Sequence, residues 1–311
     1  MGDTEIQQLS YGSYGKCVRI SNGEVELYAT LDIGPRIIRF GKVGGPNEFY
    51  EDINDNVHRD DKEISDFYGS DKGAWHIYGG HRLWTSPESL PESYFPDNRP
   101  VEAEYVENGV ILTQEPQKEN GMQFKIKVTM SKDGVVTVDH YVTNIGGKDL
   151  EFAPWSLTVM EVGGLEVVPL TKRGADLLHT RNVSLWPYAN PADKRVKWLR
   201  DFFLLNTTSD TDCNFKIGFN NEDGYVCYFN HGNMFIKRFE PFSLSEKYPD
   251  NNVNFETYTS EFIAEVETLG TLKTVAPGQT VTHRESWQLV TNVKKPESEQ
   301  EIIDAIEKYV K

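Results

Sequence analysis

Alternation of apolar and polar residues with a period of two constrains the fold of this chain more than any other feature. Runs of this kind recur from residue 16 to residue 293 and are separated by turn dipeptides. This is the pattern of half-buried strands joined by tight turns. Two hairpin signals are strong, because Asn108-Gly109 and Asp133-Gly134 each stand between two alternating arms. We therefore expect long antiparallel hairpins in a large sandwich or barrel.

Two further strand pairs are expected nearer the C-terminus. The segment 215–230 alternates around Asp223-Gly224. A last long pair, 261–269 with 280–290, is joined across Pro277-Gly278. Both patterns predict antiparallel neighbours in a sheet.

One helix is predicted, over about residues 298–310. Ser298 and Glu301 have the spacing of a capping box, and the apolar residues that follow fall on one face. The chain has no internal repeat and no low-complexity linker, so residues 1–311 are expected to form a single domain. The predicted fold class is all-β and antiparallel, with one short C-terminal helix.

The charge of the chain limits its partners. The formal net charge is −16 and the isoelectric point is about 4.9. A field of this sign repels nucleic acid and anionic membrane surfaces, so neither is expected as a partner. The acidic residues are spread along the chain, which is typical of a solubilising surface. The sequence does not indicate an oligomeric state.

The cysteines and the N-terminus indicate the compartment. Cys17, Cys213 and Cys227 have no CxxC or CxxH spacing, so they predict neither a disulfide framework nor a zinc site. The N-terminus has no apolar core of a signal peptide, and no stretch approaches the length of a membrane span. We expect a cytoplasmic protein, with a signal peptide removed upstream as the open alternative.

The motifs of several familiar chemistries are absent. The sequence has no GxSxG elbow, no HExxH, no P-loop and no GxGxxG after a strand. Serine-hydrolase, zincin and nucleotide-binding functions therefore lack support. We expect no metal and no cofactor.

Three segments concentrate polar groups next to Gly, Pro or Trp: 73–88, 152–160 and 246–270. In the first, adjacent glycines permit unusual backbone angles or the close approach of a ligand. In the last, Glu265 and Glu267 share one face of an apolar strand. Two such carboxylates face either solvent or a polar cleft, and the residues alone favour solvent.

These segments, in this order, resemble the galactose-mutarotase-like (aldose 1-epimerase-like) superfamily, in an uncharacterised branch of it. The match extends over nearly the whole chain, and its main parts are 32-DIGPRIIRFG-41, 79-GGHRLWTSPE-88, 151-EFAPWSLTVMEVGG-164, 248-YPDNNVNFETYT-259 and 265-EVETLGTLKTVAPGQTVTHRESW-287. The resemblance implies a β-supersandwich with an open, aromatic-lined sugar cleft on one concave face.

The resemblance also implies an acid and a base. Mutarotation needs a base at the anomeric hydroxyl and an acid at the ring oxygen. Glu267 takes the place of the family's general base, and Glu265 is the second choice. The family's mid-chain His is missing, because Leu157 stands at that position. His81 is a substitute candidate for the acid, against the alternative that it only bonds a loop.

The remaining candidates are ligands of the sugar. Trp84 and Trp155 are expected to stack on it. The polar candidates lie in the segments that carry the resemblance and are Arg36, Arg82, Lys216, Lys237, Asn254 and Glu256. Convergent Lys and Arg would favour an anionic sugar, such as a uronate or a sugar phosphate. The alternative is that they form ordinary ion pairs with nearby carboxylates.

Three functions stay open at this level. The first is an aldose 1-epimerase that works without a cofactor. The second is a sugar-binding protein without catalysis. The third is a lyase or another carbohydrate-processing enzyme that acts on an acidic sugar in the same cleft.

Overall fold

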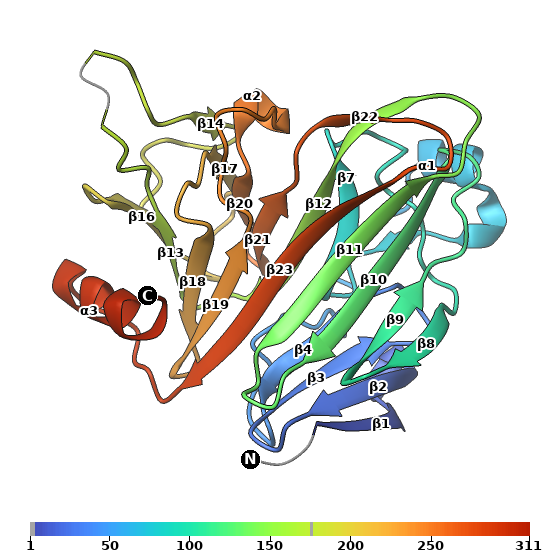
Figure 1. Cartoon of the computed structure of the whole chain (residues 1–311), viewed down its shortest axis with the longest axis horizontal. Coiled ribbons are helices and arrows are strands. Elements are labelled where there is room, and N and C mark those ends of the chain that lie inside the picture. The colour runs from blue at the N-terminus through green and yellow to red at the C-terminus, as the bar shows by residue number, and fades with distance from the viewer. Residues whose placement is uncertain (1–3, 175–176) are drawn as a thin grey trace.

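The computed structural model describes residues 4–174 and 177–311, and two large antiparallel sheets form its framework (Figure 1). Sheet 1 runs in the order β1 (Glu5–Ser10), β2 (Lys16–Ser21), β3 (Val25–Thr30), β4 (Ile37–Lys42), β7 (Gly80–Ser86), β12 (Leu150–Glu161), β21 (Ile263–Leu269), β20 (Phe255–Thr259), β17 (Phe215–Phe219) and β14 (Val183–Leu185), with β22 (Lys273–Val275) beside β12. Sheet 2 runs in the order β15 (Val196–Trp198), β16 (Phe202–Asn206), β13 (Leu165–Pro169), β18 (Tyr225–Asn230), β19 (Asn233–Phe239), β23 (Thr280–Thr291), β11 (Val136–Asn144), β10 (Met122–Met130), β9 (Gly109–Thr113) and β8 (Glu102–Val106).

The smaller elements lie around these sheets. They are the strand pair β5 (His58–Arg59) and β6 (Trp75–His76), the helices α1 (Lys62–Tyr68), α2 (Pro249–Asn252) and α3 (Glu299–Tyr309), and two 3-10 turns, Gly12–Tyr14 and Ser70–Lys72. In the part of the chain that the structure describes, no helix combines the length and the apolar character needed to cross a membrane. The prediction of an all-β, antiparallel chain is confirmed.

The main hydrophobic core fills the space between the two sheets. Phe40 of β4 meets Trp287 of β23 with ring centroids 6.1 Å apart, and Phe49 meets the same indole at 5.5 Å. These aromatic rings and the aliphatic residues around them are almost fully buried. Their burial is what the period-two alternation requires, because each strand turns its apolar side toward the other sheet.

Two hairpins form as predicted. β8 pairs with β9 around Asn108-Gly109, where Asn108 has a φ of 57°, and β10 pairs with β11 around Asp133-Gly134. Gly134 likewise has a φ of 77°, and residues that tolerate positive φ suit the tight turns that join such strands.

The other two expected pairs are wrong. β17 and β18 flank Asp223-Gly224 but lie in different sheets, and so do β21 and β23. In both places the chain reverses direction while crossing from one layer to the other. A turn dipeptide predicts the reversal, but it does not indicate whether the next strand stays in the same sheet.

The C-terminal helix is confirmed, and the short helices α1 and α2 were not expected. Ser298 caps α3, because its hydroxyl accepts a hydrogen bond from the Glu301 amide at 3.3 Å. The buried side of α3 packs on β13, β18 and β19 of sheet 2. The short helix α1 packs Ile64 and Tyr68 beside Trp75.

The adjacent glycines of segment 73–88 do allow close approach, but the group that approaches them is the protein's own backbone and not a ligand. A Cβ at Gly79 would lie 2.0 Å from the carbonyl oxygen of Tyr50, and one at Gly80 would lie 2.3 Å from that of Ile37. Both glycines also have positive φ. The pair therefore lets β7 enter sheet 1 against its neighbours.

A polar cluster is buried within the core between the sheets. Glu285 of β23 pairs with Lys237 of β19 at 2.9 Å and accepts a hydrogen bond from the Trp287 indole at 2.9 Å. From sheet 1, the hydroxyls of Ser156 and Thr268 donate to the same carboxylate. We call the fully or almost fully buried set His81, His140, Ser156, Thr158, Lys237, Thr268, His283 and Glu285 the inter-sheet cluster.

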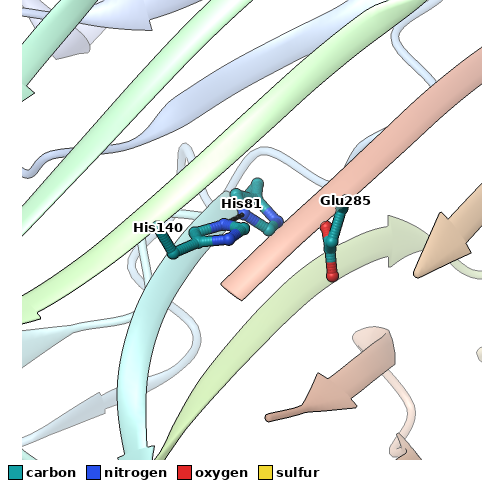
Figure 2. A group of neighbouring side chains, drawn as sticks. All are labelled: His81, His140 and Glu285. Carbon is teal, nitrogen blue, oxygen red and sulfur yellow. Dashed lines mark hydrogen bonds between the residues drawn. The ribbon is translucent and has the colours of Figure 1, made fainter. Parts of the chain in front are cut away.

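Figure 2 shows His81 and His140 of this cluster next to each other, and their hydrogen bonds fix which ring nitrogens carry protons. Nδ1 of His140 lies 2.9 Å from the carbonyl oxygen of His283, so it must donate. Nε2 of neutral His140 then accepts from Nε2 of His81 across 2.7 Å, and Nδ1 of His81 accepts from Thr158 at 2.8 Å. Burial lowers the pKa of both rings, and it lowers the pKa of His283 to about 3.

We expect Lys237→Met to lower the free energy of unfolding by about 3–5 kcal/mol, because it leaves the Glu285 carboxylate buried without its counter-ion. Urea denaturation followed by circular dichroism measures the change. The control is Lys62→Ala, which removes an exposed ion pair to Asp66 and should cost less than about 1 kcal/mol. Equal losses in the two variants would contradict a stabilising role for the buried pair.

Candidate functional site

The face of sheet 1 that points away from the core carries a row of functional side chains. Strand register places Arg82 opposite Leu157, Leu157 opposite Glu267, and Glu267 opposite Glu256, so these residues cross β7, β12, β21 and β20 on one face. Trp84 and Trp155 form the next matched pair along β7 and β12. Residues next to them in sequence, such as His81, point to the opposite face and into the core.

A cleft opens over this row. It has a cavity of about 360 Å³ that adjoins a second one of about 310 Å³, and the two share several lining residues. Aromatic rings form much of the wall. They come from Trp75, Trp84, Tyr94, Trp155, Trp186, Tyr188 and Tyr258. The rings contact one another, with Trp84 and Trp155 centroids 5.6 Å apart.

A lysine between two carboxylates forms the floor of the cleft. Nζ of Lys216 lies 3.0 Å from Glu256 and 3.0 Å from Glu267. The same ammonium lies over the rings of Trp155 and Trp186, at 4.6 and 4.7 Å from their centroids. The Trp155 indole donates to Glu267 at 2.8 Å, so the position of this carboxylate is fixed from two sides.

Burial shifts the protonation of these groups. It raises the pKa of Glu267 to about 7, against the lowering effect of Lys216, and it raises the pKa of Glu256 well above its usual range. Burial also opposes the charge of Lys216, but attraction from Glu267 and Glu256 outweighs it and raises the lysine pKa. The carboxyls titrate as a coupled pair. Near neutral pH the floor can therefore present one protonated and one ionised carboxyl side by side.

Several polar atoms around the cleft lack hydrogen-bond partners within the described residues. They include Oε1 of Glu256, Oε1 of Glu267 and Nε of Arg82. Arg82 forms an ion pair with Glu265 at 2.8 Å and lies over the Trp84 ring at 4.4 Å. Buried polar atoms of this kind are normally bonded, so the cleft is equipped to bond a polar ligand.

The structure brings together six of the residues that the sequence singled out. They are Arg82, Trp84, Trp155, Lys216, Glu256 and Glu267. Glu265 also lines the cleft, and Leu157 lies between Arg82 and Glu267.

The expectation that His81 supplies the acid is wrong, because His81 does not face Glu267 across the cleft. Its side chain lies on the opposite face of sheet 1, is fully buried, and bonds Thr158 and His140. The period of two explains the placement, since Arg82 points into the cleft and its neighbour must then point into the core. His81 cannot deliver a proton to a ligand in the cleft.

Three other expected ligands also lie outside the cleft. Lys237 is in the inter-sheet cluster with Glu285. Arg36 is fully buried and holds Asp97 through two hydrogen bonds of 2.9 and 3.0 Å. Asn254 is buried and bonds the backbone of Asn221 in both directions. All three have partners that explain their burial without a ligand.

Sequence reasoning missed much of the aromatic wall. Trp186 and Tyr188 lie on a loop after β14, and Tyr94 and Tyr258 come from other segments. A signal was present in Trp186-Pro187-Tyr188, because two large rings in a Pro-containing loop have no strand periodicity to bury them.

The inter-sheet cluster contains the one set of described residues with metal-ligand spacing. The donor atoms of His81, His140 and Glu285 all lie within 4.8 Å of one another (Figure 2). However, the Glu285 carboxylate already binds Lys237, Trp287, Ser156 and Thr268. A neighbouring ammonium and a fully bonded carboxylate suit a hydrogen-bond network rather than a cation.

No protein-family model matches the sequence, and no curated protein is significantly similar to it. Solved structures do match. A galactose mutarotase-like protein from Clostridium acetobutylicum has a TM-score of 0.56 and 12% identity, over 93% of this chain and 99% of that one.

A candidate aldose 1-epimerase from Klebsiella pneumoniae has a TM-score of 0.58 and 11% identity, over 100% and 88% of the two chains. A galactose mutarotase-like protein from Lactobacillus casei has a TM-score of 0.54 and 10% identity, over 88% and 99%. At these identities the likeness concerns the fold. The chain therefore has the galactose-mutarotase-like β-sandwich fold that the sequence motifs implied.

Proposed function

We propose that this protein binds an aldose in the cleft and interconverts its two anomers. The observation that carries the proposal is the Lys216–Glu256–Glu267 group at the floor of an aromatic-walled cavity. The solved structures of the same fold include proteins described as aldose 1-epimerase and mutarotase-like, which supports a sugar as the ligand.

The walls of the cleft suit a sugar ring. A pyranose has apolar C–H faces and a rim of hydroxyl groups. Aromatic rings such as Trp84 and Trp186 offer flat apolar surface to the faces. The unpartnered carboxylate oxygens of Glu256 and Glu267 accept hydrogen bonds from the rim.

The paired carboxyls can supply both proton transfers. Ionised Glu267 removes the proton of the anomeric hydroxyl, while protonated Glu256 donates a proton to the ring oxygen, and the bond between C1 and that oxygen breaks. The open-chain aldehyde rotates about its C1–C2 bond. On closure at the other face, the proton on the ring oxygen returns to Glu256, and Glu267 gives its proton back to the anomeric oxygen.

The family resemblance implies a mid-chain histidine as the acid. In this proposal one of the two neighbouring carboxyls takes the place of that histidine. Leu157, between Arg82 and Glu267, has no proton to give. Both oxygens that exchange protons are attached to one sugar carbon, so two carboxyls on adjacent strands β20 and β21 can reach them. Glu256 thus takes the role of acid that His81 cannot fill.

Glu267→Gln should lower the acceleration of anomer exchange by about 100-fold or more, because the amide cannot act as a base. Exchange spectroscopy by NMR on a panel of aldoses measures the rate. Circular dichroism checks folding, and the glutamine oxygen can still accept from Trp155 and Lys216. Wild-type protein that binds aldoses without accelerating exchange would instead identify a sugar-binding protein without catalysis.

The kcat/KM of exchange should rise with pH through about 7, since Glu267 must be ionised to act as base. Lys216→Met should move this limb to higher pH, because the lost ammonium no longer lowers the pKa of Glu267. Lys216→Arg keeps the charge and should leave the limb near its wild-type position. A limb that stays in place in the methionine variant would contradict the coupling.

Trp186→Ala should weaken aldose binding about tenfold, as expected for the loss of roughly 1.4 kcal/mol of ring contact. Titration calorimetry measures the affinity. Trp198→Ala is the matched control, because Trp198 is half-exposed on β15 and lies outside the cleft. Equal effects of both variants would argue against stacking at Trp186.

A further inference from the structure

The cations of the cleft are already paired. Arg59 bonds Asp61 at 2.7 Å, Arg82 pairs with Glu265 at 2.8 Å, and Lys216 lies between two carboxylates. Of the other basic candidates, Lys237 and Arg36 lie outside the cleft and have their own carboxylates. No described lining residue therefore offers an unpaired cation to an anionic sugar.

Carboxyl groups outnumber cations on the same walls. Among the described residues, three cations line the two adjoining cavities: Arg59, Arg82 and Lys216. The same cavities are lined by four carboxyl groups, those of Glu88, Asp250, Glu256 and Glu265. Glu267 lies buried directly beneath and pairs with the same lysine as Glu256. The net charge of −16 adds a field of the same sign.

The unpartnered atoms at the floor are mainly acceptors. Oε1 of Glu256 and Oε1 of Glu267 have no hydrogen-bond donor within the described chain, and both side chains are almost fully buried, whereas Oε1 of Glu265 has its ion pair with Arg82. The ionised oxygen of Glu267 bonds most strongly to a charged donor, and the carbonyl oxygen of protonated Glu256 can accept from the same donor. These two oxygens lie on the adjacent strands β20 and β21, and each can accept one N–H bond of an ammonium group, while the Glu265 carboxylate lies on the same face of β21.

We propose that the sugar of this cleft is an amino sugar, bound as its ammonium cation by Glu256, Glu265 and Glu267. The inference rests on the proposed function, because it names the class of sugar that the same site takes. A neutral aldose would fill the cleft but would leave its excess negative charge uncompensated. A uronate or sugar phosphate would add to that charge.

The electrostatics of the floor agree with a cationic ligand. Repulsion from Glu267 and Asp250 adds to burial in raising the pKa of Glu256, and repulsion from Glu265 does the same for Glu267. A bound ammonium relieves this repulsion. The surrounding indole faces also attract cations, as they do with Lys216 and Arg82.

The test compares matched sugars by titration calorimetry at a pH below the pKa of the sugar amine. The panel holds glucosamine, galactosamine and mannosamine, each with its parent hexose and its N-acetyl derivative, together with glucuronate and glucose 6-phosphate. At least one amino sugar should bind about tenfold or more tightly than its parent and its N-acetyl form, and the advantage should shrink with salt. Glu265→Gln should move the ratio of the two affinities toward one.

Glu104→Gln is the control for net charge, because Glu104 is exposed on the edge strand β8, and it should leave the ratio unchanged. Neutral hexoses or anionic sugars that bind as tightly as every amino sugar would overturn this inference and leave the proposed function standing. Absence of binding by the whole panel, with the protein folded, would overturn both.

Discussion

The ion pair between Glu285 and Lys237 is the constraint on which the rest of the molecule depends. It sits in the core between two sheets, where an unpaired charge would be costly. Three of its other bonds cross to the other sheet, from Ser156 and Thr268 to the carboxylate and from the ammonium to the Val266 carbonyl at 2.9 Å. These contacts hold β12 and β21, whose outer faces carry the floor of the cleft. The polar core thus sets the spacing of the site without touching it.

The two faces of sheet 1 explain why neighbouring residues have separate tasks. His81 bonds across the core, while Arg82 faces the cleft. On β21, Thr268 belongs to the inter-sheet cluster and Glu267 to the floor. A shift of one residue in register would exchange these sets, so burial of the polar core and assembly of the cleft specify the same register. The strand register that folding selects is therefore the same register that forms the site.

Much of this architecture could be predicted from sequence, for physical reasons. Alternation and turn residues are local signals, and they revealed the strands, two hairpins and the capped helix after Ser298. The shared face of Glu265 and Glu267 follows from the same period. The sheet to which each strand belongs is a long-range property, and the pairs around Asp223-Gly224 and Pro277-Gly278 were assigned wrongly for that reason. His81 was misplaced because spacing along one strand does not reveal which face a second sheet covers, and loop rings such as Trp186 carry no periodicity.

The two carboxylates beside Lys216 protect this lysine from a side reaction with the substrate of the proposed reaction. Ring opening exposes an aldehyde, and an uncharged lysine beside it would form an imine and block the protein. Catalytic lysines of that kind have a lowered pKa, whereas the two carboxylates raise that of Lys216 and keep it an ammonium. Its nitrogen has no free electron pair while it is so held. The lysine can therefore lie next to a reactive carbonyl through many turnovers and remain chemically inert.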